Sequence, residues 1–477
     1  MKEKILLINP PYANKEIVYF PTGLGYVAGA CAREGIDTRF IDMNLGDNQL
    51  TRVLDLIKKE RFDVIGIGGF AMQLKSTVEL ANAIKEHCKD ATIVIGGVQV
   101  FGCDEFLIKN SKADIICSGE SEILLPQIVH SLYGTADLSK FESIIYRRNG
   151  EIVYNGGFAI IEDIDSLSVP KYDLFDMESY VKGNYHNVPG RRTIDFICSR
   201  GCPYKCNYCI NSNKPFKMRY RHPDNILAEI RLLKDTYNIN DFYFGDEIFT
   251  ANKKKALEIC EILKAENVTW ITSGRADGMD DELISAMKKS GCRMLLVGFE
   301  SASEKILQEM KKRTTKEVYL RAIGLMRKYN LMFYPNFMIG MPSETEETIR
   351  ETEQFCKDNN LVFGATYVTP FPGTKLYDEI KYKIKDEKAY LYSLANLNFT
   401  KEPLINLTGM PVRELMCLRD RAVINTTAHL VQQRFRYVPI FFVRMACRMY
   451  LAIFDIKNPV ISRILRPITK AIQRLIS

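Results

Sequence analysis

The chain has 477 residues, more than one ordinary hydrophobic core accommodates, and its 46% hydrophobic and 26% charged residues are typical of a folded protein. No apolar run is long enough for a transmembrane helix and the N-terminus lacks a signal peptide's apolar region, so we predict a cytoplasmic protein. Residues 431–477 hold nine Lys or Arg and one Asp, so the net charge of +7 leaves the remaining chain near neutral. This distribution excludes a uniformly basic nucleic-acid-binding protein, and no nucleic-acid partner is expected.

Short apolar strands alternate with amphipathic helices over the first 135 residues. We predict strands at Lys4–Asn9, Asp37–Asp42, Val64–Gly68, Thr92–Gly96 and Ile115–Cys117, and helices at Leu24–Glu34, Gln49–Glu60, Ser76–Cys88 and Ile123–Leu132. Near-continuous apolar strands separated by helices predict a parallel sheet covered on both faces, which is a doubly wound, Rossmann-like domain. Such sheets bind ligands at the carboxyl ends of their strands. Glycines there either admit a ligand or simply make tight turns.

A second strand-helix alternation begins at Thr193, after a mixed segment. That segment contains a predicted hairpin over Ile144–Tyr154 with an Asn149-Gly150 turn. The later strands are predicted at Asp195–Cys198, Asp241–Phe244, Thr269–Thr272, Arg293–Gly298, Met332–Ile339 and Ala365–Thr369. Six strands do not close an eight-stranded barrel, so we expect a partial (β/α)6 barrel. The predicted α/β architecture is a Rossmann-like domain at 1–140, a linker at 141–190, the partial barrel at 191–385 and a helical C-terminal region at 386–477.

Three cysteines in one short loop, Cys202, Cys206 and Cys209, offer three thiolates to one metal centre. A structural zinc site needs four protein ligands, whereas an iron-sulfur cube held at three corners leaves one iron open. The spacing, with Tyr208 before the last cysteine, resembles the radical S-adenosylmethionine (SAM) superfamily. The resemblance implies a [4Fe-4S] cluster whose open iron binds the amino and carboxylate groups of SAM. The alternative is that these cysteines bind a zinc ion.

The same resemblance assigns SAM-binding roles to residues at the strand ends. The segment Gly245-Asp246-Glu247 stands where the family binds the SAM amino group. Arg275 by position meets the SAM carboxylate, and Glu300 holds the ribose hydroxyls or the amino group. Ile339-Gly340 belongs to the motif whose backbone contacts adenine, and Tyr208 lies beside adenine or the cluster. The alternatives are core packing for Tyr208 and a helix N-cap for the acidic pair.

The N-terminal domain is similar to the cobalamin-binding domain that precedes the radical SAM core in one large subfamily. The residues that carry the likeness, and to which it assigns cobalamin binding, are Pro10, Pro11, Thr22, Gly25, Asp42, Gly69, Gly96, Gly97, Gly119 and Glu120. One departure is Asp42-Met43-Asn44, where domains that ligate cobalt from below carry Asp-x-His. The resemblance therefore implies cobalamin bound without this histidine, and a domain that has lost the cofactor is the alternative.

The resemblance implies an enzyme that reductively cleaves SAM at the cluster to a 5′-deoxyadenosyl radical and methylates an unactivated carbon through methylcobalamin. Cyclisation or rearrangement without methyl transfer is the first alternative. A methylthiotransferase acting on tRNA is disfavoured, because the N-terminal cysteines lack a suitable context. A non-catalytic zinc- and membrane-binding protein is the alternative from another class. The expected partners are a small-molecule substrate and a flavodoxin- or ferredoxin-type electron donor, and no residue is assigned to catalysis or to the substrate.

The C-terminal end is basic and amphipathic. Arg463, Arg466, Lys470 and Arg474 share one helical face, and isoleucines and leucines form much of another. Such a segment lies readily in an anionic membrane surface, which predicts a peripheral contact with the inner face of the membrane and a hydrophobic or lipid-like substrate. A helix packed on the barrel with a solvated basic face is the alternative.

Overall fold

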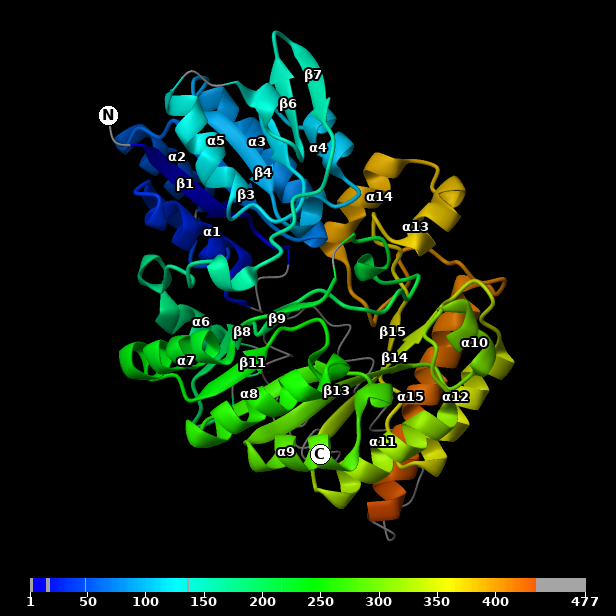
Figure 1. Cartoon of the computed structure of the whole chain (residues 1–477). Coiled ribbons are helices and arrows are strands. Elements are labelled where there is room, and N and C mark those ends of the chain that lie inside the picture. The colour runs from blue at the N-terminus through cyan, green and yellow to red at the C-terminus, as the bar shows by residue number, and fades with distance from the viewer. Residues whose placement is uncertain are drawn as a thin grey trace.

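The computed structural model describes residues 3–434, apart from 14–17, 48, 135, 136, 185, 187 and 216. Two sheets flanked by helices lie one above the other, with the N-terminal sheet at the top of Figure 1 and the second sheet below it. The helices α13 (Lys375–Ile380) and α14 (Glu387–Ser393) lie beside the upper sheet at its junction with the lower one. The predicted α/β architecture is confirmed.

The N-terminal sheet has seven strands in the order β2-β1-β3-β4-β5-β6-β7. Its strands are β1 (Lys4–Asn9), β2 (Asp37–Asp42), β3 (Val64–Gly68), β4 (Thr92–Gly96), β5 (Ile115–Cys117), β6 (Ile144–Arg148) and β7 (Glu151–Asn155). Its helices are α1 (Thr22–Arg33), α2 (Gln49–Lys59), α3 (Leu74–His87), α4 (Asp104–Asn110) and α5 (Leu124–Tyr133). The first five strands are parallel, as predicted.

Alternate residues of β1 enter different cores, because successive side chains of a strand point to opposite faces. Ile5 and Leu7 pack in a cluster with residues of α1 and α5, and Leu6 and Ile8 pack in a second cluster with residues of α2, α3 and α4. The sheet is therefore covered by helices on both faces. All the parallel strands point their carboxyl ends to one edge, where a ligand crevice forms in such folds.

The hairpin assigned to the linker belongs to the N-terminal sheet. Asn149 and Gly150 both have positive φ, at 51° and 85°, as the tight turn requires, and β6 pairs antiparallel with β5. The sheet thus extends to Asn155, beyond the predicted boundary at residue 140, because β6 covers the otherwise open edge of β5. The remaining linker includes α6 (Met177–Gly183).

The second sheet has six parallel strands in the order β15-β14-β13-β12-β11-β8. Its strands are β8 (Thr193–Phe196), β11 (Asp241–Phe244), β12 (Thr269–Gly274), β13 (Cys292–Glu300), β14 (Phe333–Ile339) and β15 (Ala365–Tyr367). Its helices are α7 (Pro223–Tyr237), α8 (Lys253–Ala265), α9 (Asp281–Lys289), α10 (Glu304–Glu309), α11 (Lys316–Lys328) and α12 (Glu346–Asp358). The edge strands β8 and β15 do not pair with each other, so the barrel is partial, as predicted.

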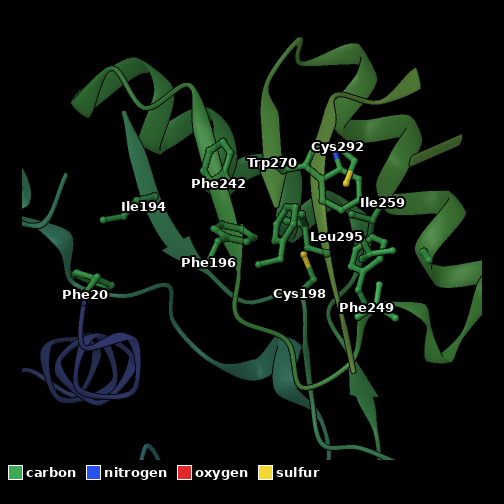
Figure 2. Close-up of a cluster of buried hydrophobic side chains, with 14 of the residues drawn as sticks. Phe20, Ile194, Phe196, Cys198, Phe242, Phe249, Ile259, Trp270, Cys292 and Leu295 are labelled. Carbon is green, nitrogen blue, oxygen red and sulfur yellow. The ribbon is translucent and has the colours of Figure 1, made fainter. Parts of the chain in front are cut away.

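Aromatic side chains fill the core between this sheet and its outer helices (Figure 2). The ring of Phe244 lies 5.5 Å from that of Phe196 and 5.4 Å from that of Trp270. The Trp270 indole donates to the Ser290 carbonyl at 3.0 Å, so its one polar group is satisfied. Cys198, fully buried among these residues, lies beyond the end of β8, which stops at Phe196 rather than at the predicted Cys198.

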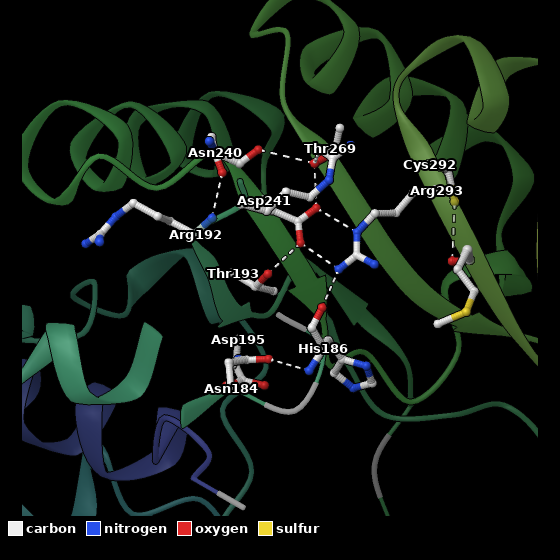
Figure 3. A network of polar contacts seen from close by, with 12 residues as sticks. Asn184, His186, Arg192, Thr193, Asp195, Asn240, Asp241, Thr269, Cys292 and Arg293 are labelled. Carbon is white, nitrogen blue, oxygen red and sulfur yellow. Dashed lines mark hydrogen bonds and ion pairs between the residues drawn. The ribbon is translucent and has the colours of Figure 1, made fainter. Parts of the chain in front are cut away.

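A buried polar network occupies the amino ends of the barrel strands (Figure 3). Asp241 accepts hydrogen bonds from Arg293 at 2.9 and 2.7 Å and from the Thr193 hydroxyl at 2.7 Å. Arg293 also donates to the His186 carbonyl at 2.7 Å. Because its charges are paired, this network can stabilise the fold, and barrels of this kind carry their active sites at the opposite, carboxyl ends of the strands.

The C-terminal region packs on both halves of the molecule. Tyr377, Tyr390, Leu391 and Leu394, from α13, α14 and the turn after them, join the core of the N-terminal sheet, and α15 (Val412–Arg434) packs on α12. Within the part of the chain described, no helix combines the length and apolarity needed to cross a bilayer. The basic segment 461–476, with its predicted membrane contact, lies outside the described residues.

Candidate active site between the two sheets

The cysteine loop follows β8 at the carboxyl end of the barrel. Cys206 is buried, Cys202 and Cys209 are partly exposed, and all three are free thiols. Burial, followed by the neighbouring Cys209 and Cys206 thiols, raises the pKa of the Cys202 thiol to about 11. The Cys209 amide donates to the Cys206 carbonyl at 3.1 Å, so a tight turn joins two of the three predicted cluster ligands, and Cys202 precedes this turn in the same loop.

A single metal ion and an iron-sulfur cluster place different demands on these thiols. In the described residues, no three His, Cys, Asp or Glu side chains form a group fit for one metal ion. A zinc ion needs all its donors at about 2.3 Å, whereas in a cube each thiolate binds a different iron, so the thiolates stand further apart. Cys198 offers no fourth ligand, because its side chain lies in the aromatic core.

Asp246 and Glu247, predicted to bind the SAM amino group, hold the backbone just before Cys202, the first of the three predicted cluster ligands. Glu247 accepts from the Gly201 amide at 3.0 Å, and buried Asp246 accepts from the Cys198 amide at 3.2 Å and from the Ser199 hydroxyl. Burial raises the pKa of Asp246 to about 6. Gly245 continues the strand pairing, since its amide donates to the Phe196 carbonyl at 2.9 Å. Glu247 alone of the three presents an exposed acidic side chain.

Arg275 lies against the cysteine loop. Its guanidinium makes two hydrogen bonds to Asp277, at 2.9 and 3.0 Å, and one to the Lys312 carbonyl at 2.6 Å. A fourth hydrogen bond reaches Sγ of Cys206 at 3.6 Å, and the guanidinium carbon lies 3.8 Å from the ring centroid of Tyr204. The side chain predicted to bind the SAM carboxylate therefore bonds to Asp277, to the Lys312 carbonyl and to Cys206, a predicted cluster ligand.

Glu300 ends β13 in a conformation that non-glycine residues rarely adopt, with φ of 63° at an irregularity in the strand pairing. Its carboxylate pairs with buried Lys312 at 2.8 Å. Burial, followed by the charges of Glu300 and Cys206, raises the pKa of Tyr208 well above its usual value, so Tyr208 lies near both this carboxylate and the thiols. Strained backbone of this kind gathers at functional sites.

Ile339 and Gly340 lie at the end of β14, on the same edge. Ile339 is fully buried, and Gly340 has φ of 104°, a conformation that favours glycine. The Gly340 amide donates to Glu344 at 3.3 Å, and burial raises the pKa of Glu344 to about 7. The Gly340 backbone is thereby fixed at the mouth of the barrel.

At the facing edge of the N-terminal sheet, the polar groups predicted to bind cobalamin are held by one another. Asp42 accepts from the Asn9 amide at 3.0 Å and from the Tyr180 hydroxyl at 2.7 Å. The Pro10 carbonyl accepts from Asn44 at 3.1 Å, and the Pro11 carbonyl accepts from Ser76 at 2.8 Å. These contacts make the ends of β1 and β2 a rigid support.

The glycine loops after β3 and β4 touch each other. Gly97 has φ of 84°, and a Cβ atom there would lie 2.9 Å from the amide and carbonyl of Gly69. Gly96 has open space by comparison, since its nearest neighbour would be the Ser121 hydroxyl at 3.5 Å. Exposed Phe70 follows Gly69 in sequence. The glycines let these two loops pack closely against each other at the ends of β3 and β4.

The predicted Thr22 and Gly25 lie at the start of α1 and serve packing. The Thr22 hydroxyl donates to the Phe20 carbonyl at 3.3 Å, and a Cβ on Gly25 would lie 3.0 Å from Pro170 and 3.2 Å from Phe20. Gly25 therefore allows the linker to lie against α1.

Gly119 contacts the segment after β7, and Glu120 joins the two halves of the molecule. Gly119 has φ of 106° and leaves no room for a Cβ beside the Ala159 carbonyl, at 2.3 Å. Glu120 binds Arg219 through two hydrogen bonds, at 2.7 and 2.9 Å, and Arg200 at 3.3 Å. Arg200 also pairs with buried Glu122 at 2.6 Å.

We call these four residues, Glu120, Glu122, Arg200 and Arg219, the domain clamp. Arg200 in β9 (Ser199–Arg200) pairs with Arg219 in β10 (Arg219–Tyr220), and the cysteine loop runs between these two short strands. The clamp ties the edge of the N-terminal sheet to that loop. Sequence reasoning missed Arg200, Arg219, Glu122 and Lys312, because charged residues near a motif carry no signal of their distant partners.

Comparison with known proteins agrees with this arrangement. The B12 binding domain profile matches residues 13–129, and the Radical SAM superfamily profile matches residues 196–356. An uncharacterised methyltransferase of Pyrococcus horikoshii is 30% identical over 386 residues, which are 79% of this chain and 82% of the relative. The anaerobic magnesium-protoporphyrin IX monomethyl ester cyclase of Synechocystis is 27% identical, over 78% of this chain and 76% of the relative.

A solved structure shares the fold. It is the radical SAM methyltransferase TsrM of Kitasatospora setae with cobalamin and a [4Fe-4S] cluster bound, at 17% identity and a TM-score of 0.68, covering 80% of this chain and 78% of that one. The predicted cofactors, a [4Fe-4S] cluster, SAM and cobalamin, are those of the two matched families. The chain belongs to the radical SAM superfamily, in the subfamily whose members carry an N-terminal cobalamin-binding domain.

Proposed function

We propose that this enzyme transfers a methyl group to an unactivated carbon of a small hydrophobic or lipid-like substrate. In this proposal Cys202, Cys206 and Cys209 hold the cluster. SAM is bound by the residues at the barrel mouth, with Tyr208 and Glu300 beside the thiols and the Gly340 backbone facing adenine. The closely packed loops at Gly69 and Gly97 would lie against the corrin ring. The cofactors supply radical formation and a transferable methyl group, and the protein holds both against one substrate.

The observation that carries the proposal is the domain clamp. Arg200 stands two residues before Cys202 and binds Glu120 and Glu122 in the loop after β5, at the edge where sheets of this kind bind ligands. All four side chains are at most 15% exposed. Two cofactor edges fixed against each other suit a reaction in which a carbon activated at one edge receives a group from the other.

Cyclisation without methyl transfer is the second candidate, and a relative favours it, because the Synechocystis protein is named as a cyclase. Both reactions use a cluster, SAM and a cobalamin-type domain, so the fold supports both. Their use of SAM differs. Methyl transfer consumes SAM twice, giving deoxyadenosine and methionine from one molecule and S-adenosylhomocysteine from the other, whereas cyclisation gives no S-adenosylhomocysteine.

The test is an anaerobic reaction of the full chain with SAM carrying a deuterated methyl group, a reductant, cobalamin and a total lipid extract. We expect deoxyadenosine and S-adenosylhomocysteine to accumulate together, with a lipid product heavier by one labelled methyl group. Deoxyadenosine without S-adenosylhomocysteine or label would contradict methyl transfer and support cyclisation. A protein in which Cys202 is replaced by alanine is the control for background cleavage.

A flavodoxin- or ferredoxin-type electron donor and a peripheral membrane contact through residues 461–476 are part of the proposal. The membrane contact would place the enzyme near a lipid-like substrate, since the segment carries four basic residues on one predicted face. Replacing Arg463, Arg466, Lys470 and Arg474 by glutamate should release the protein from anionic vesicles. Unchanged cosedimentation would reject the contact and leave the radical chemistry unaffected.

A further inference from the structure

Arg275 is held as a fixed cation behind a cluster ligand. Asp277 binds its Nε and Nη2 atoms, and the Lys312 carbonyl binds Nη2 again. The ring of Tyr204, from the cysteine loop itself, stacks on the guanidinium. These contacts fix the remaining nitrogen, Nη1, on Sγ of Cys206 at 3.6 Å. The geometry aims a charged donor at one thiolate.

The surroundings make this contact electrostatically strong. Arg275 and Cys206 are each 7% exposed, so little water screens their interaction. Asp277 neutralises part of the charge, yet its oxygens bind the Nε and Nη2 side of the guanidinium, and the Nη1 side faces the sulfur. The cation therefore acts on Cys206 more directly than its counter-ion does.

A positive charge at a ligand sulfur changes the reduction potential of an iron-sulfur cluster. Reduction adds one electron to a centre that already carries negative thiolates, and a hydrogen bond or cation at a sulfur stabilises the added charge. A SAM-cleaving cluster has to accept that electron from an external one-electron donor. A higher reduction potential makes it easier for the donor to reduce the cluster, which has to happen before any substrate is activated.

We propose that Arg275 is a positioning residue that raises the reduction potential of the cluster through Cys206, with Asp277 limiting the effect. This inference rests on the proposed cluster ligands and is independent of the methyl-transfer step. It differs from the role expected from sequence, in which Arg275 binds the SAM carboxylate. The titration without SAM tests the effect of Arg275 on the cluster by itself, whereas binding of the SAM carboxylate is a separate property that is measured with SAM present.

The experiment is a redox titration of the anaerobically reconstituted full chain without SAM, followed by electron paramagnetic resonance of the reduced cluster. In Arg275→Gln we expect the reduced-to-oxidised ratio at a fixed solution potential to fall about tenfold, which is 59 mV for a one-electron couple. In Asp277→Asn, which keeps the cation and removes its counter-charge, we expect the potential to rise. If Arg275 and Asp277 were only a structural ion pair, the two substitutions would not shift the reduction potential in opposite directions.

Arg293→Gln is the matched control. Arg293 also forms a buried two-bond pair, with Asp241, but at the opposite end of the barrel (Figure 3). We expect it to lower stability and leave the potential unchanged. An Arg275→Gln protein with full iron content and the wild-type potential would overturn the inference. If Arg275→Gln takes up no iron, the test rests on Asp277→Asn, and a lowered potential in that variant would overturn the inference. Wild-type protein that binds no iron would refute the cluster assignment itself.

Discussion

The two sheets use the same edge in different ways. At the carboxyl ends of the N-terminal strands, polar side chains such as Asp42 and Asn9 bind one another, and the loops after β3 and β4 begin with glycines. At the carboxyl ends of the barrel strands, charged groups such as Arg275 and Glu300 surround thiols. Backbone shape suits a large flat ligand, whereas fixed charges suit an anionic cluster and a charged nucleoside. One strand arrangement thus supports two kinds of binding.

The largest effect should come from removing a thiol at the barrel edge. Replacing Cys202, Cys206 or Cys209 by alanine should abolish the brown colour and lower deoxyadenosine formation by more than about 100-fold, which exceeds the usual cost of losing an outer partner of a metal ligand. Iron analysis and chromatography of deoxyadenosine measure both. Cys198→Ala is the control, because that thiol lies in the aromatic core, and equal iron loss there would contradict the ligand assignment.

Breaking the domain clamp should separate the two edges. Arg200→Gln leaves Glu122, whose side chain is 5% exposed, buried without its cation, which costs about 3–5 kcal/mol for such pairs. We expect a lower denaturation midpoint and faster proteolysis between the sheets. Arg350→Gln, which breaks the exposed pair with Glu346, should cost at most about 1 kcal/mol. Equal effects of the two substitutions would argue against the clamp.

Buried carboxyl groups make the stability of the barrel depend on pH. Burial raises the pKa of Glu344 to about 7, above its usual 4.5, so the folded state favours the protonated form. Its stabilising contribution is full below pH 4.5 and is lost as the pH rises through 7, by about 3 kcal/mol at most. Glu344→Gln should remove this decline in denaturant midpoints between pH 5 and about pH 8. Glu346→Gln, at a partly exposed carboxylate, should leave the decline in place. An unchanged decline in Glu344→Gln would reject burial of Glu344 as its cause.

The smallest effect on activity should come from the glycine loops after β3 and β4 of the N-terminal sheet. Gly97→Ala forces a Cβ to within 2.9 Å of the Gly69 backbone, at a φ of 84° that costs about 1–3 kcal/mol for other residues. We expect weaker cobalamin retention with unchanged iron content, measured by absorbance after gel filtration. Gly96→Ala is the matched neighbour, because its Cβ would meet only ordinary contacts. Equal cobalamin loss in both would contradict the role of Gly97.

The sequence by itself determined the two sheets, the turn at Asn149-Gly150 and the three-cysteine loop. Each of these depends on local features: apolar runs separated by helices, a turn dipeptide with positive φ and a fixed ligand spacing. The placement of Glu300 and Gly340 at the barrel mouth also followed, because parallel strands end at one edge.

Only the tertiary structure decided which charges face each other. Arg275 reaches Cys206 across 69 positions of sequence, and Arg200 reaches Glu122 across 78. The hairpin over Ile144–Arg148 and Glu151–Asn155 joined the first sheet for the same kind of reason, since the open edge of β5 was available to it. Coulombic and pairing energies depend on distance in space, and the order of residues along the chain does not contain that distance.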